Sequence, residues 1–314
     1  MNQLDQIKQF TTIVADTSDF SRLRTFTPQD ATTNPSLILR AVQSPSYANI
    51  IHEIRSQHPI ASIDDCINHL LVRFGIEILN IIPGRVSTEI DADLSFDIEE
   101  SLLRARQIID LYEAQGIDRK RVLIKIAGTW EGIQTARILE REGIACNVTL
   151  VFHLVQAVAC ADAKVTLISP FVGRITDWYK KSLTDPSQAQ QMTGKNDPGV
   201  QSVMQIYHYL KHYDHATQIM GASFRNIEQI IALAGCDLLT ISPELLDALQ
   251  KSTGSVTAKL LVAKAKELDI PKLTVNEKSF RQMLNDDAMA TEKLAEGIRN
   301  FKKDTLTLGK LLQG

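Results

Sequence analysis

The sequence predicts an α/β protein, a (β/α)8 TIM barrel formed by a single domain with extra N- and C-terminal helices. Eight short apolar segments alternate with helical segments at spacings of roughly 20–50 residues, which favours parallel strands joined by helices. Polar residues recur near the C-terminal ends of those apolar segments, and no linker or repeat divides residues 1–314. A doubly wound open sheet is the alternative, but such a sheet usually contains fewer strands.

Each predicted strand is a short run rich in Val, Ile, Leu and Thr, as expected for strands buried between a barrel interior and its helices. The second strand is stopped by Pro35, because proline interrupts the hydrogen-bond ladder. The predicted strands are 11–16, 30–35, 85–90, 122–127, 146–150, 165–171, 218–223 and 238–242.

Capping residues place the helices between these strands. Asp97 begins a well-patterned helix that ends before Gly116, and Gly143 ends the helix after the fourth strand. The predicted helices are a short one at the N-terminus, then 18–25, 36–43, further helical sequence to about 80, 97–115, 130–142, 153–163, 198–213, 226–234 and 288–303. Residues 183–198 are predicted to be polar and irregular, and a C-terminal helical extension is expected over about 285–314.

Composition excludes several classes of function. The 314 residues are 44% hydrophobic and 23% charged, with a net charge of −3 and no long basic run, so neither nucleic acid nor a membrane is an expected partner. The first residues lack the pattern of a signal peptide, and no apolar run approaches the ~18 residues of a membrane span. The cysteines are far apart and typical of a reduced, cytoplasmic protein: Cys66, Cys146, Cys160 and Cys236.

The fourth predicted strand, residues 122–127, contains a lysine among apolar residues. Strand alternation places Lys125 on the same face as Leu123 and Ala127. Burying an ammonium costs free energy unless the group is paired or neutral, and a neutral lysine amine attacks carbonyl carbons to form a Schiff base. The alternative is a lysine at a strand end that reaches water or pairs with an acid.

The predicted strands share polar side chains on one face near their C-terminal ends. These are Asp16, Thr32, Asn34, Ser87, Glu89, Lys125, Asn147, Thr149, Ser169, Ser223, Arg225, Thr240 and Ser242. The C-terminal mouth of a barrel is where enzymes with this fold place their active sites. Helix capping explains any single Ser or Thr, but Asp16, Glu89 and Lys125 at equivalent strand positions indicate a shared site.

These residue types suit chemistry on a carbonyl substrate. The amine of Lys125 would attack a ketone, and Glu89 would move the required protons, directly or through a water held by Thr149. The resulting iminium is an electron sink for breaking the adjacent carbon–carbon bond. Asp16 is the candidate base for the substrate hydroxyl.

Other polar residues suit a phosphorylated sugar. Asn34 and Asn147 are neutral groups able to hydrogen-bond hydroxyls. Arg174 and Arg225 are the expected anion clamp, because a guanidinium matches the geometry of phosphate oxygens.

Several segments resemble transaldolases, in the same order and over nearly the whole chain from Thr11 to about Arg299. They are residues 30–37 (DATTNPSL), 84–91 (GRVSTEID), 122–127 (VLIKIA), 168–174 (ISPFVGR) and 220–226 (MGASFRN). A set of long segments in a fixed order is far more specific than one short motif.

The resemblance implies a cofactor-independent transferase of the pentose phosphate pathway with a class I aldolase-type barrel and no metal. Such enzymes move a dihydroxyacetone unit from sedoheptulose 7-phosphate to glyceraldehyde 3-phosphate, giving erythrose 4-phosphate and fructose 6-phosphate, and the family suggests a homodimer. The implied catalytic residues are the Schiff-base Lys125, Glu89 acting with a water, the base Asp16, and Thr149. The implied substrate-binding residues are Thr32, Asn34, Asn147, Ser169, Phe171, Arg174, Ser223 and Arg225.

Two alternatives to a transaldolase stay open. Fructose 6-phosphate aldolases release free dihydroxyacetone, but they tend to have glutamine where Glu89 stands and tyrosine where Phe171 stands. A barrel without activity that serves as a binding partner is the second alternative. The chain also departs from the common transaldolase pattern, with His153 in place of a small polar residue and Gly128 in place of a serine.

Metal and nucleotide sites have weaker support. His208 and His212 have the spacing of metal ligands on one helix face, with His215 nearby, but no glutamate completes a zincin pattern. Residues 193–196 (TGKN) lack the leading glycine and the Ser or Thr of a P-loop, and no G-x-G-x-x-G follows a strand. We therefore expect neither a metal nor a cofactor.

Overall fold

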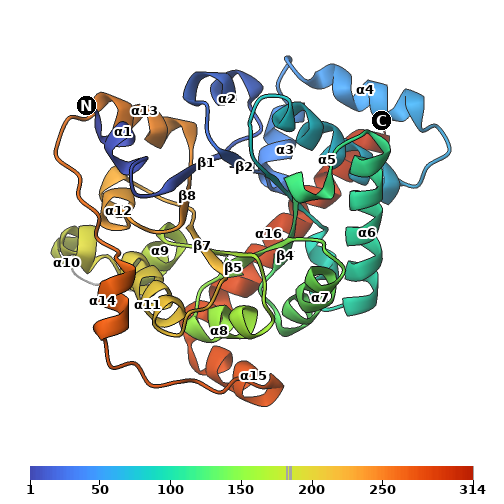
Figure 1. Ribbon diagram of the computed structural model, residues 1–314. Coiled ribbons are helices and arrows are strands. Elements are labelled where there is room, and N and C mark those ends of the chain that lie inside the picture. The colour runs from blue at the N-terminus through green and yellow to red at the C-terminus, as the bar shows by residue number, and fades with distance from the viewer. Residues whose placement is uncertain (182, 184–185, 314) are drawn as a thin grey trace.

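Eight parallel strands close into a barrel in chain order, β1 to β8, and helices surround it (Figure 1). The structure is a computed structural model that describes residues 1–181, 183 and 186–313. The predicted (β/α)8 barrel is confirmed. Its strands are β1 (Thr12–Asp16), β2 (Asp30–Thr32), β3 (Val86–Glu89), β4 (Val122–Ala127), β5 (Cys146–Val151), β6 (Leu167–Pro170), β7 (Gln218–Gly221) and β8 (Leu238–Ile241).

Helices connect the strands and cover the outer surface of the barrel. Before β5 they are α1 (Gln3–Ile7), α2 (Phe20–Phe26), α3 (Pro35–Val42), α4 (Ala48–Gln57), α5 (Ile63–Leu79), α6 (Ile98–Ala114) and α7 (Trp130–Arg141). After β5 they are α8 (Leu154–Asp162), α9 (Gly173–Lys181), α10 (Pro186–Gln191), α11 (Pro198–His212), α12 (Ile227–Ala232), α13 (Pro243–Lys251), α14 (Val262–Glu267), α15 (Glu277–Asp286) and α16 (Ala288–Gln313). Short 3-10 helices are η1 (Ala92–Leu94), η2 (Arg119–Arg121) and η3 (Gly194–Asn196).

The strand register aligns the ionisable residues of neighbouring strands. Glu89 of β3 pairs with Lys125 of β4, and Lys125 pairs in turn with Asn147 of β5. Asp16, the last residue of β1, pairs with Thr32 of β2. Because all the strands are parallel, these side chains meet at the C-terminal mouth of the barrel.

The barrel interior is apolar below this mouth. A small cluster of buried side chains fills it: Val14, Leu123, Leu167, Met220 and Leu238. Each lies two positions before a residue at the mouth, such as Leu123 before Lys125. The apolar interior residues and the residues at the mouth therefore lie on the same strand faces.

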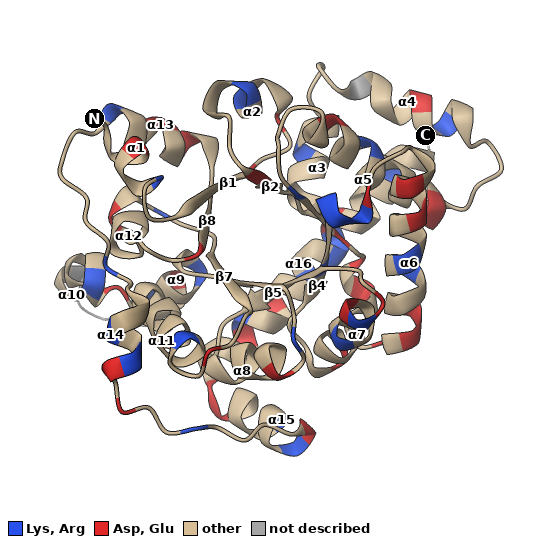
Figure 2. Ribbon diagram, in the orientation of Figure 1, with Lys and Arg blue, Asp and Glu red and all other residues tan. Residues whose placement is uncertain are grey.

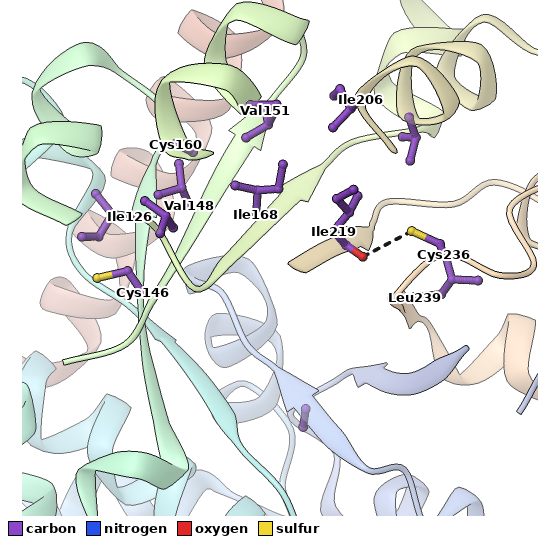
Figure 3. Close-up of a cluster of buried hydrophobic side chains, with 14 of the residues drawn as sticks. Ile126, Cys146, Val148, Val151, Cys160, Ile168, Ile206, Ile219, Cys236 and Leu239 are labelled. Atoms are coloured by element: carbon purple, nitrogen blue, oxygen red, sulfur yellow. Dashed lines mark hydrogen bonds between the residues drawn. The ribbon is translucent and has the colours of Figure 1, made fainter. Parts of the chain in front are cut away.

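The outward strand faces pack under the helices and form the main core. Figure 3 shows part of it, with Ile126, Val148 and Ile168 packed beside one another. Cys236 lies in the same core, and its Sγ donates a hydrogen bond to the backbone oxygen of Ile219 at 3.2 Å. This packing fixes which face of each strand points into the barrel.

Helix α16 crosses the barrel opening (Figure 1). A separate apolar cluster joins the helix to the ends of β5 and β6, with Leu294, Ile298 and Phe301 packed among residues that include Leu150 and Phe171. Polar contacts fix its far half, where Asp304 accepts a hydrogen bond from Ser36 and Lys302 pairs with Asp93.

Several predicted segments differ in extent from the elements of the structure. The region 183–198, expected to be irregular, contains α10 and η3, although residues 184 and 185 lie outside the described part of the chain. The last helix does not end at Lys303 but continues to Gln313, because Leu308 and Leu312 extend its buried face against α3, α4 and α5. Residue 314 is also outside the described residues.

Charged residues of both signs are distributed over the peripheral helices (Figure 2). Within the residues that the structure describes, no helix is long and apolar enough to cross a membrane.

Candidate active site

Lys125 and Glu89 form a buried ion pair at the mouth of the barrel. Lys125 Nζ lies 2.8 Å from Glu89 Oε2, and the two side chains are 5% and 3% exposed. The same ammonium donates a hydrogen bond to the backbone oxygen of Thr33 at 3.0 Å. Burial raises the pKa of Glu89, and the positive charge of Lys125 opposes that rise. The pair therefore holds a proton donor and a strengthened base in direct contact.

Asp16 is the second carboxylate of the site. Thr32 Oγ1 donates to Asp16 Oδ1 at 3.0 Å and also lies 2.7 Å from the hydroxyl of Thr240. Burial raises the pKa of Asp16, while Lys125 and the hydrogen bond from Thr32 lower it. The net direction is upward, so the Asp16 carboxylate is a stronger base than an exposed aspartate.

A cavity of about 180 Å³ opens between these groups. Ten of the predicted site residues line it: Asp16, Thr32, Asn34, Lys125, Thr149, Ser169, Phe171, Arg174, Ser223 and Arg225. Glu89 and Asn147 do not. Glu89 contacts Lys125. Asn147 bonds the hydroxyls of a residue on β3 and one on β6, donating to Ser87 Oγ at 3.0 Å and accepting from Ser169 Oγ at 2.6 Å.

Thr149 lies beside an irregularity in β5. The pairing register with β6 shifts between Val148 and Val151, and Leu150 has a left-handed backbone with φ 56°. The hydroxyl oxygen of Thr149 is buried and has no hydrogen-bond partner among the residues described. A buried hydroxyl normally has a partner, so this one is available to a substrate or water in the cavity.

Gln156 of α8 holds the irregular end of β5 in place. Its Oε1 accepts from the backbone N–H groups of Phe152 and His153 at 2.8 and 3.0 Å. Its Nε2 donates to the backbone oxygens of Gly128 and Leu150 at 2.7 and 3.0 Å. The unusual residue His153 serves as the N-cap of α8, with Nδ1 accepting from the N–H of Val155 at 3.0 Å.

Two arginines line the cavity, and they differ in burial and in hydrogen bonding. Arg225 is half-exposed and already pairs with Asp177, with its Nη2 2.8 Å and its Nε 3.0 Å from Oδ2. Arg174 is largely buried, and its Nη1 has no hydrogen-bond partner within the described part of the chain. Burial and the nearby Arg225 lower the pKa of Arg174. The predicted anion clamp therefore has one arginine that is paired and one that offers a buried N–H group.

Ser223 and Asn34 reach the site through local backbone geometry. Strand alternation alone would point Ser223 away from the interior, like Ile219 and Gly221, but its φ of 61° breaks the alternation and it lines the cavity. Asn34 lies just after β2 and caps α3, with Oδ1 accepting from the N–H of Leu37 at 3.0 Å.

Sequence reasoning missed several residues of the cavity. Its lining also includes Met220, Ala222, Phe224 and Phe301. Met220 and Ala222 follow from the alternation of β7, which would have found them. Phe301 has no such signal, because it comes from α16, far along the chain from the strands.

The histidines considered as metal ligands do not form a cluster. His212 Nδ1 lies 3.1 Å from the backbone oxygen of Ala265, and His215 stacks on Tyr209. In the part of the chain that the structure covers, no group of three or more His, Cys, Asp or Glu residues is placed to hold a metal ion.

A wider groove of about 1000 Å³ lies outside the barrel, between α8, α11 and the segment 268–273. Apolar residues such as Met204 and Leu268 make up much of its lining, and Lys125 and the two carboxylates are absent from that lining. The smaller cavity at the mouth is therefore the candidate active site, because the ionisable groups converge there.

The closed barrel and the ionisable groups gathered at its C-terminal mouth define an enzyme of the TIM-barrel class. Comparison with models of protein families matches residues 13–312 to the family described as Transaldolase/Fructose-6-phosphate aldolase. The chain belongs to the transaldolase/fructose-6-phosphate aldolase family.

Proposed function

We propose that the protein is a transaldolase that transfers a dihydroxyacetone unit from sedoheptulose 7-phosphate to glyceraldehyde 3-phosphate. Erythrose 4-phosphate and fructose 6-phosphate are the products, and a Schiff base on Lys125 carries the transferred unit. The main support is the buried contact between Lys125 Nζ and Glu89 Oε2 at 2.8 Å, beside a cavity that Asp16 also lines.

The first step forms the Schiff base. Glu89 takes a proton from the ammonium of Lys125, for which its raised pKa is suited, and the neutral amine attacks the ketone carbon. The carbinolamine then loses water, with the proton for the leaving hydroxyl returned by Glu89. The hydroxyl of Thr149, which has no hydrogen-bond partner among the described residues, supports the placement of a water between these groups.

The second step breaks the carbon–carbon bond. Asp16 removes the proton of the substrate hydroxyl, the bond electrons move into the iminium, and an aldehyde leaves. The dihydroxyacetone unit stays on Lys125 as an enamine, which then attacks the carbonyl of the acceptor aldehyde. The raised pKa of Asp16 supports its role as base in cleavage and as acid in the reverse direction.

Transfer rather than release is supported by residues of the site. A fructose 6-phosphate aldolase would protonate the enamine and release dihydroxyacetone with the help of water. Phe171 places an apolar ring in the cavity and packs edge-on against Phe152, with ring centroids 5.5 Å apart. A phenyl ring has no hydroxyl to hold a water at that point.

A comparison of transfer with release tests the proposal. Purified protein is incubated with fructose 6-phosphate with and without erythrose 4-phosphate, and sedoheptulose 7-phosphate and free dihydroxyacetone are measured separately. We expect fast formation of sedoheptulose 7-phosphate, slow release of dihydroxyacetone and ping-pong kinetics. Release that matches transfer in rate would instead assign the aldolase activity, and neither product would indicate an inactive barrel.

Borohydride trapping tests the role of Lys125. Reduction in the presence of fructose 6-phosphate is expected to add a dihydroxyacetone-derived mass to the peptide that contains Lys125. Lys211 serves as a matched control, because it also pairs with a carboxylate, at 2.7 Å from Asp237 Oδ2, but lies outside the cavity. A modified peptide elsewhere, or none, would refute the Schiff-base assignment.

We further propose that the enzyme works in the cytoplasm as a homodimer. The support is the resemblance of the chain to transaldolases. Light scattering coupled to size-exclusion chromatography tests the oligomeric state, and a mass near 35.0 kDa would contradict the dimer.

A further inference from the structure

Arg174 is held in the site by aromatic rings. Its guanidinium carbon lies 4.8 Å from the ring centroid of Phe171 and 5.4 Å from that of Phe301. Both rings are buried, and the Nη1 of Arg174 has no hydrogen-bond partner in the described residues. Arg85 differs, because the carboxylate of Asp30 orients it at 3.0 Å.

The two rings have different origins. Phe171 follows β6 and so belongs to the barrel, whereas Phe301 belongs to α16. The Phe301 ring also lies 6.0 Å from Lys125 Nζ, so one side chain contacts both the reacting end and the arginine end of the cavity. A cation beside a π face is attracted by the ring quadrupole, most strongly where water is excluded.

The position of α16 fixes the position of this ring. Gly297 lies one turn before Phe301, and a Cβ atom there would be only 2.6 Å from Leu150 Cδ2 and 3.4 Å from Arg174 Nη1. The helix thus approaches β5 and Arg174 closely where it has no side chain. Beyond Phe301, the contact between Asp304 and Ser36 ties the helix to α3.

We propose that Phe301 is a positioning residue for phosphate recognition, and that it holds the Arg174 guanidinium flat so that its N–H edge faces the phosphate of the sugar. The inference rests on the proposed function, because it assigns the anion to the phosphorylated acceptor. In this arrangement α16 is part of the substrate site as well as a cover for the barrel.

The test compares two acceptors of the same length, glyceraldehyde 3-phosphate and glyceraldehyde. In ping-pong kinetics kcat/KM for the acceptor reports only the steps from acceptor binding onward. The ratio of kcat/KM for the two acceptors therefore measures the contribution of the phosphate. In Phe301→Leu this ratio is expected to fall about tenfold, equivalent to ~1.4 kcal/mol. Phe301→Tyr keeps the ring and is expected to keep the ratio within about twofold of the wild-type value.

Two controls separate positioning from general loosening of the fold. Phe280→Leu removes another buried ring of the C-terminal region, packed on Trp130 with centroids 5.4 Å apart, and is expected to leave the ratio unchanged. In an Arg174→Lys background the planar partner is gone, so Phe301→Leu is expected to change the ratio by less than about twofold. If Phe301→Leu does not fold, Phe301→Met replaces it, because methionine fills volume without a π face.

An equal loss of kcat/KM for both acceptors in Phe301→Leu, which leaves the ratio unchanged, would overturn the inference. So would the same fall in the ratio when Phe301→Leu is made in the Arg174→Lys background. A wild-type protein without transfer to either acceptor would refute the proposed function instead. The two failures are therefore distinguishable.

Discussion

Glu89 and Lys125 are register partners on adjacent strands, and their charged groups lie 2.8 Å apart inside the barrel. Parallel pairing of β3 with β4 makes them neighbours, and both residues are buried. Removing one partner from such a pair leaves an uncompensated buried charge, so both stability and chemistry depend on it.

Glu89→Gln is expected to lower kcat for transfer by about a hundredfold or more, because the amide cannot accept the lysine proton. Initial rates with fructose 6-phosphate and erythrose 4-phosphate measure the effect, and circular dichroism reports the fold. Glu140→Gln is the matched control. Glu140 is also largely buried and accepts from the N–H groups of Cys146 and Thr166, but lies outside the cavity. Transfer at the wild-type rate in Glu89→Gln would exclude the proposed role.

Asp16→Asn is expected to stabilise the folded protein at neutral pH. Burial raises the pKa of Asp16 above its unfolded value, so the folded state holds the proton more tightly, and stability falls as pH rises through the folded pKa. Asparagine cannot ionise, and its oxygen still accepts from Thr32. The urea midpoint of the variant should exceed that of the wild type near pH 8, with the gap narrowing toward about pH 4.

Asp19→Asn is expected to destabilise the folded protein at neutral pH, the opposite of Asp16→Asn. Although partial burial raises the pKa of Asp19, hydrogen bonds from Ser21 and Arg22 hold it below its ordinary value. The stabilising effect of the Asp19 carboxylate is present above the unfolded pKa and is lost as pH falls through the folded pKa. Asp19→Asn should therefore be less stable than the wild type near pH 8. Parallel pH profiles for the two variants would contradict both assignments.

Arg174 and Arg225 should differ in their effect on phosphate recognition. Arg174→Ala is expected to raise KM for glyceraldehyde 3-phosphate about a hundredfold, and Arg225→Ala about tenfold, because hydrogen bonds to charged groups are stronger when desolvated. Arg225 is exposed and shares its charge with Asp177, so its effect should also shrink in added salt. Equal effects of the two substitutions at every salt concentration would count against this division.

Gln156→Ala is expected to lower the free energy of unfolding by about 3 kcal/mol, because four backbone groups, three of them in buried hydrogen bonds, lose their partner. Urea unfolding measures the loss. Gln201→Ala, on the exposed face of α11 with one long side-chain hydrogen bond of 3.3 Å, should cost less than about 0.5 kcal/mol. Similar losses in both variants would show that the four contacts of Gln156 contribute little.

Much of the barrel was predictable because strand and helix signals are local. The predicted strand at 122–127 matches β4, and the Asp97 cap and the Gly116 stop match α6. The strand predicted at 30–35 is shorter in the structure and ends at Thr32. Asn34 and Pro35 instead begin α3, a cap followed by proline at the first helical position, so the signal was present but assigned to the wrong element.

In the candidate site, local sequence patterns predicted some residues, and long-range packing places the others. Alternation along single strands was enough to place Asp16, Glu89 and Lys125 at one end of the barrel. The position of Phe301 depends on how a helix from the far end of the chain packs across the mouth, and no local pattern carries that information. The pairing of Arg225 with Asp177 likewise joins residues of separate loops and helices.

Helix α16 also sets the order in which the site is completed during synthesis. The last barrel strand ends at Ile241, so every strand residue of the site has been made well before Phe301 is added. A ribosome-bound chain ending between these two points would carry the lysine, both carboxylates and Arg174, yet lack the ring that α16 brings to the cavity. The full preference for phosphorylated acceptors would then arise only when the final helix docks, late in the synthesis of the chain.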